Sequence, residues 1–373
     1  MADYSTINTV PAANIATVGG VAKASIANMH GLTTPSSGGD QWVIGFEDGG
    51  MGHAASSDLS SWTTFYGGTG GAGENVDFTN CAYGKDGNGD PLWVYVWTRA
   101  NQEIRIIGDI TAGAGSVGGI NLTPSDSALQ VVEWANDMWV AFGDMDTAHC
   151  FTSPDGSTWT ERDLSGLSGV NNEDVYGVTT NGAGVWIFVQ ADRIYRSEDN
   201  AATFALSHDF NNNNVNLKNI VYLKDEDCFV LMRHQQTGSK FWACPASDTS
   251  DWSANDATST LGYSARKCIA AGGSTVVAAY LTKYQRMTVS GTTITLDNSG
   301  TAQDLPFTGN SDKVTDCATD GAGNWLITHE TGKISVSTDD GVTFNSAATG
   351  VNVAGVAADD NITTVAVNVY KPM

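Results

Sequence analysis

The chain has 373 residues and carries 18 Lys and Arg against 41 Asp and Glu, a formal charge of −23. A surface this acidic repels nucleic-acid phosphates and anionic membranes, so we expect neither as a partner. No apolar run reaches the roughly 18 residues that span a bilayer, and residues 1–4 do not begin a basic and apolar secretory signal; neither membrane insertion nor a signal peptide is predicted.

Residues 1–37 differ from the rest because they contain no Trp and almost no charge. Residues 15–21 read IATVGGV, and eleven residues after its start the pattern recurs in residues 26–32 as IANMHGL. The apolar positions of this duplication are Ile15, Val18, Val21, Ile26, Met29 and Leu32. We interpret the segment as an arm that docks on another subunit, or as a first strand lying on the domain that follows.

From residue 38 to residue 373 short strands recur with a regular spacing. Each follows a Gly, Asn or Asp turn, and they are anchored on Trp42, Trp93, Trp139, Trp186, Phe229, Val276 and Trp325. The anchors lie 43 to 51 residues apart, which is the length of a four-stranded propeller blade. The sequence therefore predicts an all-β fold, a β-propeller over residues 38–373 whose repeated Trp residues form the core.

An eighth strand signal, residues 364–367, ends the chain without outer strands of its own. We predict that it inserts beside the first unit and closes the ring, since closure removes exposed sheet edges. Seven blades are predicted, and eight blades with a composite last blade are the alternative.

A small hydroxyl residue, an Asp, a turn residue and an aromatic recur in this order. The copies contain Ser56, Asp58 and Trp62; Ser153, Asp155, Gly156 and Trp159; Ser197, Asp199 and Phe204; Asp248 and Trp252; and Ser337, Asp339, Gly341 and Phe344. An Asp at this spacing accepts hydrogen bonds from the amides of its own turn, and the aromatic opens the next strand and packs beneath the loop. The motif therefore predicts a hairpin turn.

These copies resemble the Asp-box repeat, also called the bacterial neuraminidase repeat, which reads S-x-D-x-G-x-T-W/F between the third and fourth strands of a propeller blade. The resemblance implies that the Asp residues hold turns at the blade periphery and are not catalytic. The same repeats occur in sialidases, sugar-binding proteins, assembly factors and phage structural proteins, so the fold does not fix the function. Two units, around residues 105–107 and 287–289, lack the motif and must close by other means.

Candidate catalytic and metal-binding groups are few. A sialidase needs three converging arginines, the first usually in F/Y-R-I-P, but Arg105 lies in EIRII without the proline. Carboxylate pairs such as those among Glu133, Asp144 and Asp146 are unavoidable in so acidic a chain and favour no glycosidase. Residues 86–90, DGNGD, begin like a calcium loop, but they align with hairpin tips elsewhere in the chain and predict a turn.

The six cysteines include no C-x-x-C pair, and Cys81, Cys268 and Cys317 occupy one equivalent position in three repeats. We predict free, buried thiols. No catalytic residue, cofactor or metal site is predicted.

The arm also resembles segments of the type I-x-x-Φ-x-G-V-A-x-A-S-I in tailed-phage virion proteins, where apolar arms dock on neighbouring subunits. The resemblance implies a non-enzymatic virion component, a capsid decoration or tail fibre protein assembled in the host cytoplasm and present in multiple copies. Its partners would be other virion proteins and, for host attachment, a surface glycan or protein. The alternatives are a sialidase-like propeller that binds or hydrolyses carbohydrate and an intracellular assembly factor.

Overall fold

The computed structural model describes residues 17–18, 21–22, 41–47, 50–55, 59, 62–66, 78–97, 103–108, 117–122, 129–143, 149–170, 175–211, 216–235, 238–250, 252, 256–261, 268–309, 311–348 and 361–367. The chain divides into two compact units, Met1–Asp40 and Gln41–Met373. In the first unit, β1 (Thr17–Val18) and β2 (Val21–Ala22) form a small antiparallel pair in which Val18 lies opposite Val21. The other predicted arm positions, Ile15, Ile26, Met29 and Leu32, lie outside the described residues.

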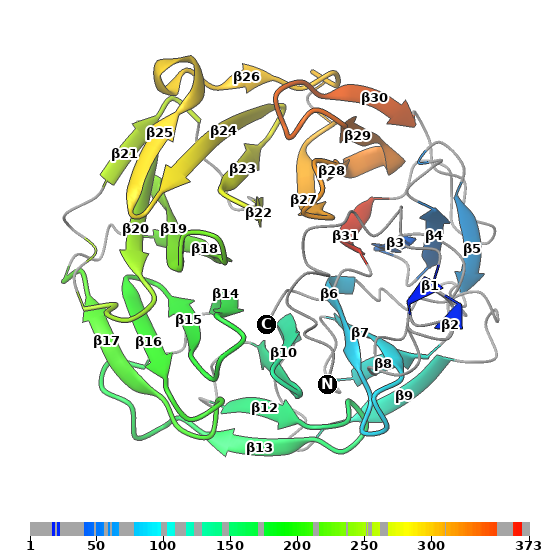
Figure 1. Cartoon of the computed structure of the whole chain (residues 1–373), viewed down its shortest axis with the longest axis vertical. Helices are drawn as coiled ribbons and strands as arrows, with labels where there is room; N and C mark the ends of the chain where they lie inside the picture. The colour runs from blue at the N-terminus through cyan, green and yellow to red at the C-terminus, as the bar shows by residue number, and fades with distance from the viewer. Residues whose placement is uncertain are drawn as a thin grey trace. The chain divides into compact units, whose positions relative to one another are not determined.

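The second unit is a ring of seven antiparallel sheets, counted over the described residues, and Figure 1 looks down its axis. Blade 1 combines the C-terminal strand β31 (Ile362–Val367) with β3 (Gln41–Phe46), β4 (Met51–Ala55) and β5 (Thr63–Tyr66). Blades 2 and 3 are β6 (Phe78–Lys85), β7 (Pro91–Trp97), β8 (Glu103–Ile107) and β9 (Val117–Asn121), then β10 (Leu129–Ala135), β11 (Met138–Gly143), β12 (His149–Ser153) and β13 (Thr160–Asp163).

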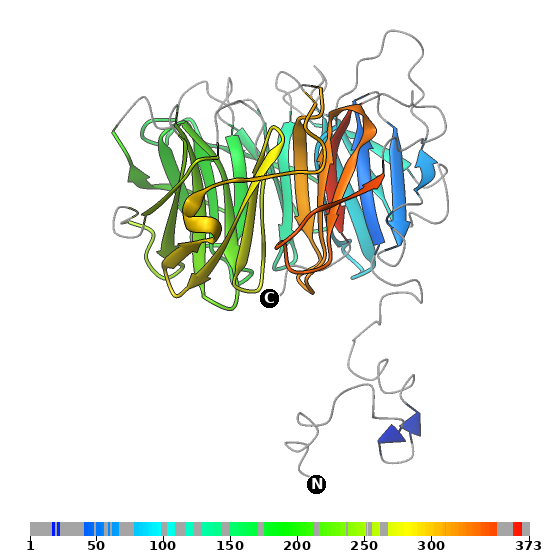
Figure 2. The same cartoon turned by 90° about the horizontal axis from the view of Figure 1, so that it is seen from above.

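The remaining blades follow in chain order, and in Figure 2 their strands run between the two faces of the ring. Blades 4 and 5 are β14 (Val175–Thr180), β15 (Trp186–Gln190), β16 (Arg193–Ser197) and β17 (Ala205–Asp209), then β18 (Asn216–Leu223), β19 (Cys228–Gln235), β20 (Gly238–Pro245) and β21 (Asp256–Ser259). Blades 6 and 7 are β22 (Cys268–Gly272), β23 (Thr275–Tyr280), β24 (Lys283–Ser290) and β25 (Thr293–Leu296), then β27 (Val314–Thr319), β28 (Trp325–His329), β29 (Ile334–Ser337) and β30 (Asn345–Ala348).

Blade 6 is one of the two units that lack the repeated motif of a hydroxyl residue, an Asp and an aromatic. Its outer strands are joined by a different turn. Its third and fourth strands are joined by a two-residue turn in which Gly291 has a φ of 57°, a left-handed conformation that glycine adopts without strain. A short 3-10 helix, η5 (Asp297–Gly300), and an extra strand, β26 (Gln303–Asp304), then cover the other end of β24. A second 3-10 turn, η6 (Glu330–Gly332), joins β28 to β29, and neither described helix is long and apolar enough to cross a membrane.

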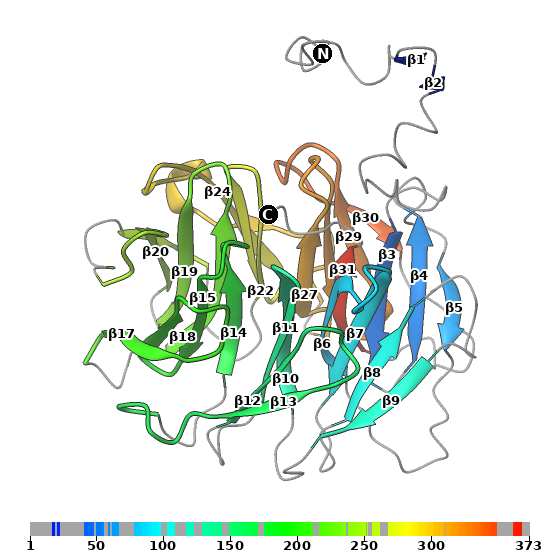
Figure 3. The ribbon, with the colours of Figure 1, turned by 60° about the horizontal axis from the view of Figure 1, so that its bottom comes forward.

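The C-terminal strand closes the ring as predicted. Strand β31 pairs antiparallel with β3, with Trp42 opposite Val367 and Phe46 opposite Ile362. Figure 3 shows β31 between β27 of blade 7 and β6 of blade 2. The eight-blade alternative is wrong because residues 364–367 are the innermost strand of blade 1 and not the start of a further blade.

The core fills the spaces between adjacent blades. Trp residues of the second strands are buried, with Trp42, Trp139 and Trp186 fully inaccessible to solvent. Burying a side chain of this size contributes on the order of 2–3 kcal/mol, and the repeat supplies one such anchor to most blades. Trp134 and Trp242, which stand outside the two repeat positions, are buried as well.

Six of the seven innermost strands carry a one-residue shift in register near their start. Such a bulge leaves one residue unpaired and twists the strand, which re-aims the next side chain. In β6 the shift lies between Phe78 and Asn80, and in β27 it lies between Val314 and Asp316. The polar residue that follows the bulge is thereby placed beside the neighbouring blade.

Candidate functional site

In blades 3, 4, 5 and 7 the predicted motifs form turns that join the third and fourth strands, and we call them Ser-Asp turns. In blade 7, Asp339 Oδ1 accepts a hydrogen bond from the Thr343 amide at 2.9 Å and its Oδ2 accepts one from Thr343 Oγ1 at 2.6 Å. Ser337 Oγ accepts a hydrogen bond from the Gly341 amide, where a φ of 76° suits glycine. In blade 4, Ser197 and Asp199 make the same bonds to residues 201 and 203.

The turn of blade 3 is one residue shorter and tighter. Asp155 Oδ1 accepts hydrogen bonds from the amides of Ser157 at 2.8 Å and Thr158 at 2.6 Å. Burial disfavours the ionised carboxylate, but these bonds and one from Ser153 outweigh burial and lower the pKa of Asp155 to about 2. The pKa values of the corresponding carboxyls in blades 4 and 7 are also lowered, by the same balance.

The two looser copies are less complete. In blade 5, Asp248 Oδ1 accepts a hydrogen bond from the Ser250 amide, and the fully buried Trp252 donates its indole N–H to the Thr249 carbonyl. In blade 1, Ser56 and Asp58 lie outside the described residues, while Trp62 donates its indole N–H to the Leu59 carbonyl at 3.0 Å. The motif's other aromatics lie beneath their loops: Trp159, which donates to the Gly156 carbonyl and is half-buried, and the buried Phe204 and Phe344.

The residue after the Asp fastens the turn to neighbouring elements, a role that the motif did not predict. Asp340 accepts hydrogen bonds from the indole N–H of Trp325 in its own blade and from Arg286 Nη2 of blade 6 at 2.8 Å. Asn200 of blade 4 accepts from Trp186 Nε1 and donates to the Asn136 carbonyl of blade 3. These polar groups hold blades together.

The calcium-like segment of residues 86–90 forms the β6–β7 hairpin tip, as the aligned copies predicted. Asp86 Oδ1 accepts hydrogen bonds from the amides of Asn88 and Asp90, and Asp320 makes the same bonds at the β27–β28 tip. Across the described part of the chain, no group of three or more His, Cys, Asp or Glu side chains is placed to hold a metal ion.

The structure does not bring together, within the residues it describes, the carboxylates considered for glycoside hydrolysis. Glu133 is buried in β10 and its Oε1 accepts a hydrogen bond from the Trp134 amide, whereas Asp144 and Asp146 lie outside the described residues. Arg105, the residue compared with the sialidase motif, lies in β8.

All six cysteines are free and buried, as predicted. Cys81, Cys268 and Cys317 lie on the innermost strands β6, β22 and β27, and burial raises the pKa of each thiol. A buried thiol with a raised pKa is a poor nucleophile and behaves as a small apolar side chain.

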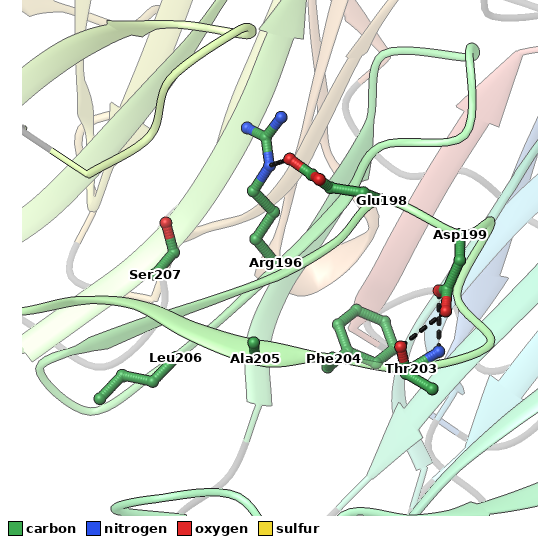
Figure 4. Close-up of a pocket in the computed structure, with 8 residues that line it drawn as sticks. All are labelled: Arg196, Glu198, Asp199, Thr203, Phe204, Ala205, Leu206 and Ser207. Carbon is green, nitrogen blue, oxygen red and sulfur yellow. Dashed lines mark hydrogen bonds and ion pairs between the residues drawn. The ribbon is translucent and has the colours of Figure 1, made fainter.

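One open pocket of about 380 Å³ lies at the rim of blade 4, along the hairpin of β16 and β17 (Figure 4). It is lined by Arg196, Glu198, Asp199, Thr203, Phe204, Ala205, Leu206 and Ser207. Arg196 Nε donates to Glu198 Oε1 at 3.0 Å, and its Nη1 donates to the Ala246 carbonyl and to Thr249 Oγ1 of blade 5. Of these lining residues only Asp199 and Phe204 were singled out from the sequence, as turn residues.

No protein-family model matches the chain, and no curated protein matches it. Solved structures match it at low sequence identity. A protein from Lactobacillus plantarum is 11% identical with a TM-score of 0.57 over 88% of this chain and 99% of its own. A streptogramin B lyase is 14% identical, with a TM-score of 0.55 over 72% of this chain and 82% of its own.

The WD40 β-propeller domain of Doa1 is 11% identical, with a TM-score of 0.55 over 80% of this chain and 89% of its own. At these identities the similarities concern the fold alone, because one propeller architecture carries many unrelated functions. They agree with the blade topology in making this chain a seven-bladed β-propeller.

Proposed function

We propose that this chain is a non-enzymatic structural and binding component of a tailed-phage virion, with an Asp-box propeller displayed on the particle and residues 1–37 docked on other virion proteins. The observation that carries the proposal is the contrast between the two parts of the sequence. Residues 1–37 are apolar, duplicated and almost uncharged, while the acidic residues are concentrated in the propeller. An apolar arm is suited to burial on another subunit, and an acidic surface is suited to exposure at a particle's exterior.

The polar groups of the repeat support a non-enzymatic role. The carboxylates of Asp155, Asp199 and Asp339 are occupied by the amides and hydroxyls of their own turns. Lowered pKa values keep them ionised at neutral pH, so none of them is suited to act as a general acid.

Ring closure supports display outside a cell. The β3–β31 ladder completes blade 1 from the two ends of the propeller sequence, and a ring of blades leaves only short sheet edges exposed. Several copies on one particle would convert weak binding to a host-surface glycan or protein into firm attachment.

The test compares the full chain with a variant that lacks residues 1–37, expressed with the structural proteins of the same genome. We expect the full chain to enter particles and the truncated chain to remain a folded, soluble propeller, as judged by circular dichroism and by sedimentation with purified particles. A full-length variant in which Ser replaces Ile15, Val18, Ile26 and Met29 should likewise stay folded and fail to enter particles. If the full chain and the truncated chain associate with particles equally, or neither does, the proposal is wrong.

A further inference from the structure

The pocket at the rim of blade 4 lies on one face of a two-stranded hairpin. Arg196 of β16 lies opposite Ala205 of β17, and Ser207 follows two residues further along the same strand. Ser207 stands at a bulge between the paired residues Leu206 and His208, but its hydroxyl and Arg196 Nη1 both contact Thr249 Oγ1, so the two side chains lie on the same face. Ser207 Oγ also lies 2.7 Å from Thr249 Oγ1, so blade 5 borders this face.

The Arg196 guanidinium is held rigidly and presents its remaining nitrogen. Its side chain is only 12% exposed, and hydrogen bonds to Glu198, Ala246 and Thr249 fix Nε and Nη1. Within the described residues, Nη2 makes no hydrogen bond to the protein. The paired Glu198 side chain is 74% exposed, and its second carboxylate oxygen is likewise without a protein partner in that part of the chain.

A donor and an acceptor thus stand side by side at the pocket. A hydroxyl group donates one hydrogen bond and accepts others, so two adjacent hydroxyls of a sugar ring can donate to a carboxylate and accept from a guanidinium at once. The Thr203 hydroxyl donates to Asp199 and the Ser207 hydroxyl is bonded to Thr249, so each can add an acceptor to the pocket. The exposed Ala205 contributes an apolar surface between them, while Phe204 and Leu206 pack toward the core.

Charge decides between neutral and anionic ligands. The pocket has two carboxylates, Glu198 and Asp199, against one guanidinium, and the chain carries a formal charge of −23. This field disfavours sulfated, phosphorylated or carboxylated sugars. A volume of about 380 Å³ lies within the range of small-ligand pockets.

We propose that this pocket binds a neutral saccharide through the Arg196 and Glu198 pair. The inference rests on the proposed function, for which it names the class of host-surface ligand. The turns of blades 3 and 7 lack this chemistry, because Thr152 and Pro154 occupy the corresponding positions in blade 3 and Val336 and Thr338 occupy them in blade 7. Among the three Ser-Asp turns of blades 3, 4 and 7, blade 4 alone carries the pair.

The test uses the full-length chain and a panel of neutral oligosaccharides containing glucose, galactose, mannose, fucose or N-acetylhexosamines. Binding is detected by saturation-transfer NMR and measured by titration calorimetry. We expect at least one saccharide to bind with one site per chain. Ala205→Trp, at an exposed position that makes no side-chain hydrogen bond, should fill the pocket and weaken binding at least tenfold. Glu198→Gln should weaken it several-fold.

The matched control is Asn345→Trp, which places the same bulk on the exposed equivalent position of blade 7 and should leave binding unchanged. If no saccharide of the panel binds, if binding survives Ala205→Trp, or if only anionic sugars bind, the inference is wrong. Particle association of the full chain with no saccharide binding would overturn this site and leave the virion role standing. Saccharide binding without particle association would leave this site standing and overturn the virion role.

Discussion

The joint between blades 2 and 3 and the joint between blades 7 and 1 each contain a hydrogen bond from a backbone amide to a side-chain oxygen. The group that accepts the bond differs between the two joints. Asn80, after the bulge of β6, accepts a hydrogen bond from the Val132 amide of the next innermost strand at 3.1 Å. Asp316, after the bulge of β27, accepts one from the Val365 amide of β31 at 3.0 Å. One joint therefore uses a neutral carboxamide and the other a carboxylate.

The carboxylate joint carries more contacts. Asp316 also accepts hydrogen bonds from the Cys317 amide and from Thr364 Oγ1, and the Thr364 hydroxyl lies 3.4 Å from Cys81 Sγ in blade 2. These side chains connect blades 7, 1 and 2 at the closure of the ring. Strand β31 pairs with β3, the first strand of the propeller sequence, so the extra contacts stand where the ring joins its first and last strands.

The largest expected effect follows from removing β31. A chain ending at residue 360 loses the innermost strand of blade 1 and exposes one face of its core, including Trp42 and Ile44. The lost burial of several apolar side chains is comparable to the whole stability of a typical domain, so we expect aggregation or loss of cooperative unfolding. Differential scanning calorimetry and size-exclusion chromatography measure this.

A shorter truncation that keeps residues 361–367 is the control and should unfold like the full chain. A monomeric, cooperatively unfolding chain that ends at residue 360 would show that blade 1 does not need its C-terminal strand.

The next effect is on pH dependence, and it separates the two joints. Burial raises the pKa of Asp316 to about 6 and outweighs the three hydrogen bonds, which lower it. Because the folded-state pKa lies above the unfolded value, the contribution of this group is fully present below pH 3.8 and is lost as the pH rises through about 6. The carboxyl group is enclosed although the residue as a whole is half-buried, so we expect a change on the order of 1–2 kcal/mol.

Exchanging the carboxylate and the carboxamide between the two joints tests whether burial of Asp316 causes this pH dependence. Between pH 7 and pH 5 the free energy of unfolding of the natural chain should rise relative to that of Asp316→Asn, as followed by urea denaturation. Asn80→Asp should transfer a dependence of the same sign to the joint between blades 2 and 3. Parallel stability curves for all three proteins across this range would contradict the proposed role of burial.

The sequence predicted the features of the fold that repeat. The spacing of the apolar anchors, mostly Trp, placed the second strand of each blade, and the surplus strand at residues 364–367 located the closure. The inner-strand bulges were not predictable, because Asn80 and Asp316 resemble the turn residues that punctuate the whole chain. Their role depends on the angle between neighbouring blades, which no local pattern encodes.

The pocket was missed for a related reason. Arg196 lies near the end of β16 and Glu198 follows two residues later, in the turn, and this pairing of opposite charges was the available signal. The signal alone describes an ordinary surface ion pair. What fixes the guanidinium is the carbonyl of Ala246, 50 residues further along the chain, and that contact arises only when blades 4 and 5 pack together.

The last effect, which is confined to one turn, distinguishes the two polar residues of a Ser-Asp turn. Ser337 is fully buried, and Ser337→Ala leaves the buried Gly341 amide without its acceptor, which costs roughly 1–3 kcal/mol. Asp339→Ala leaves the exposed Thr343 amide to bond with water, so we expect a loss of only about 0.5–1.5 kcal/mol. Because its pKa is lowered on folding, the contribution of Asp339 is present above the unfolded value of 3.8 and disappears as the pH falls through the folded-state value. Urea denaturation at pH 7 and pH 3 measures both variants, and a larger loss for Asp339→Ala than for Ser337→Ala at pH 7 would mean that the carboxylate, and not the buried hydroxyl, holds the turn.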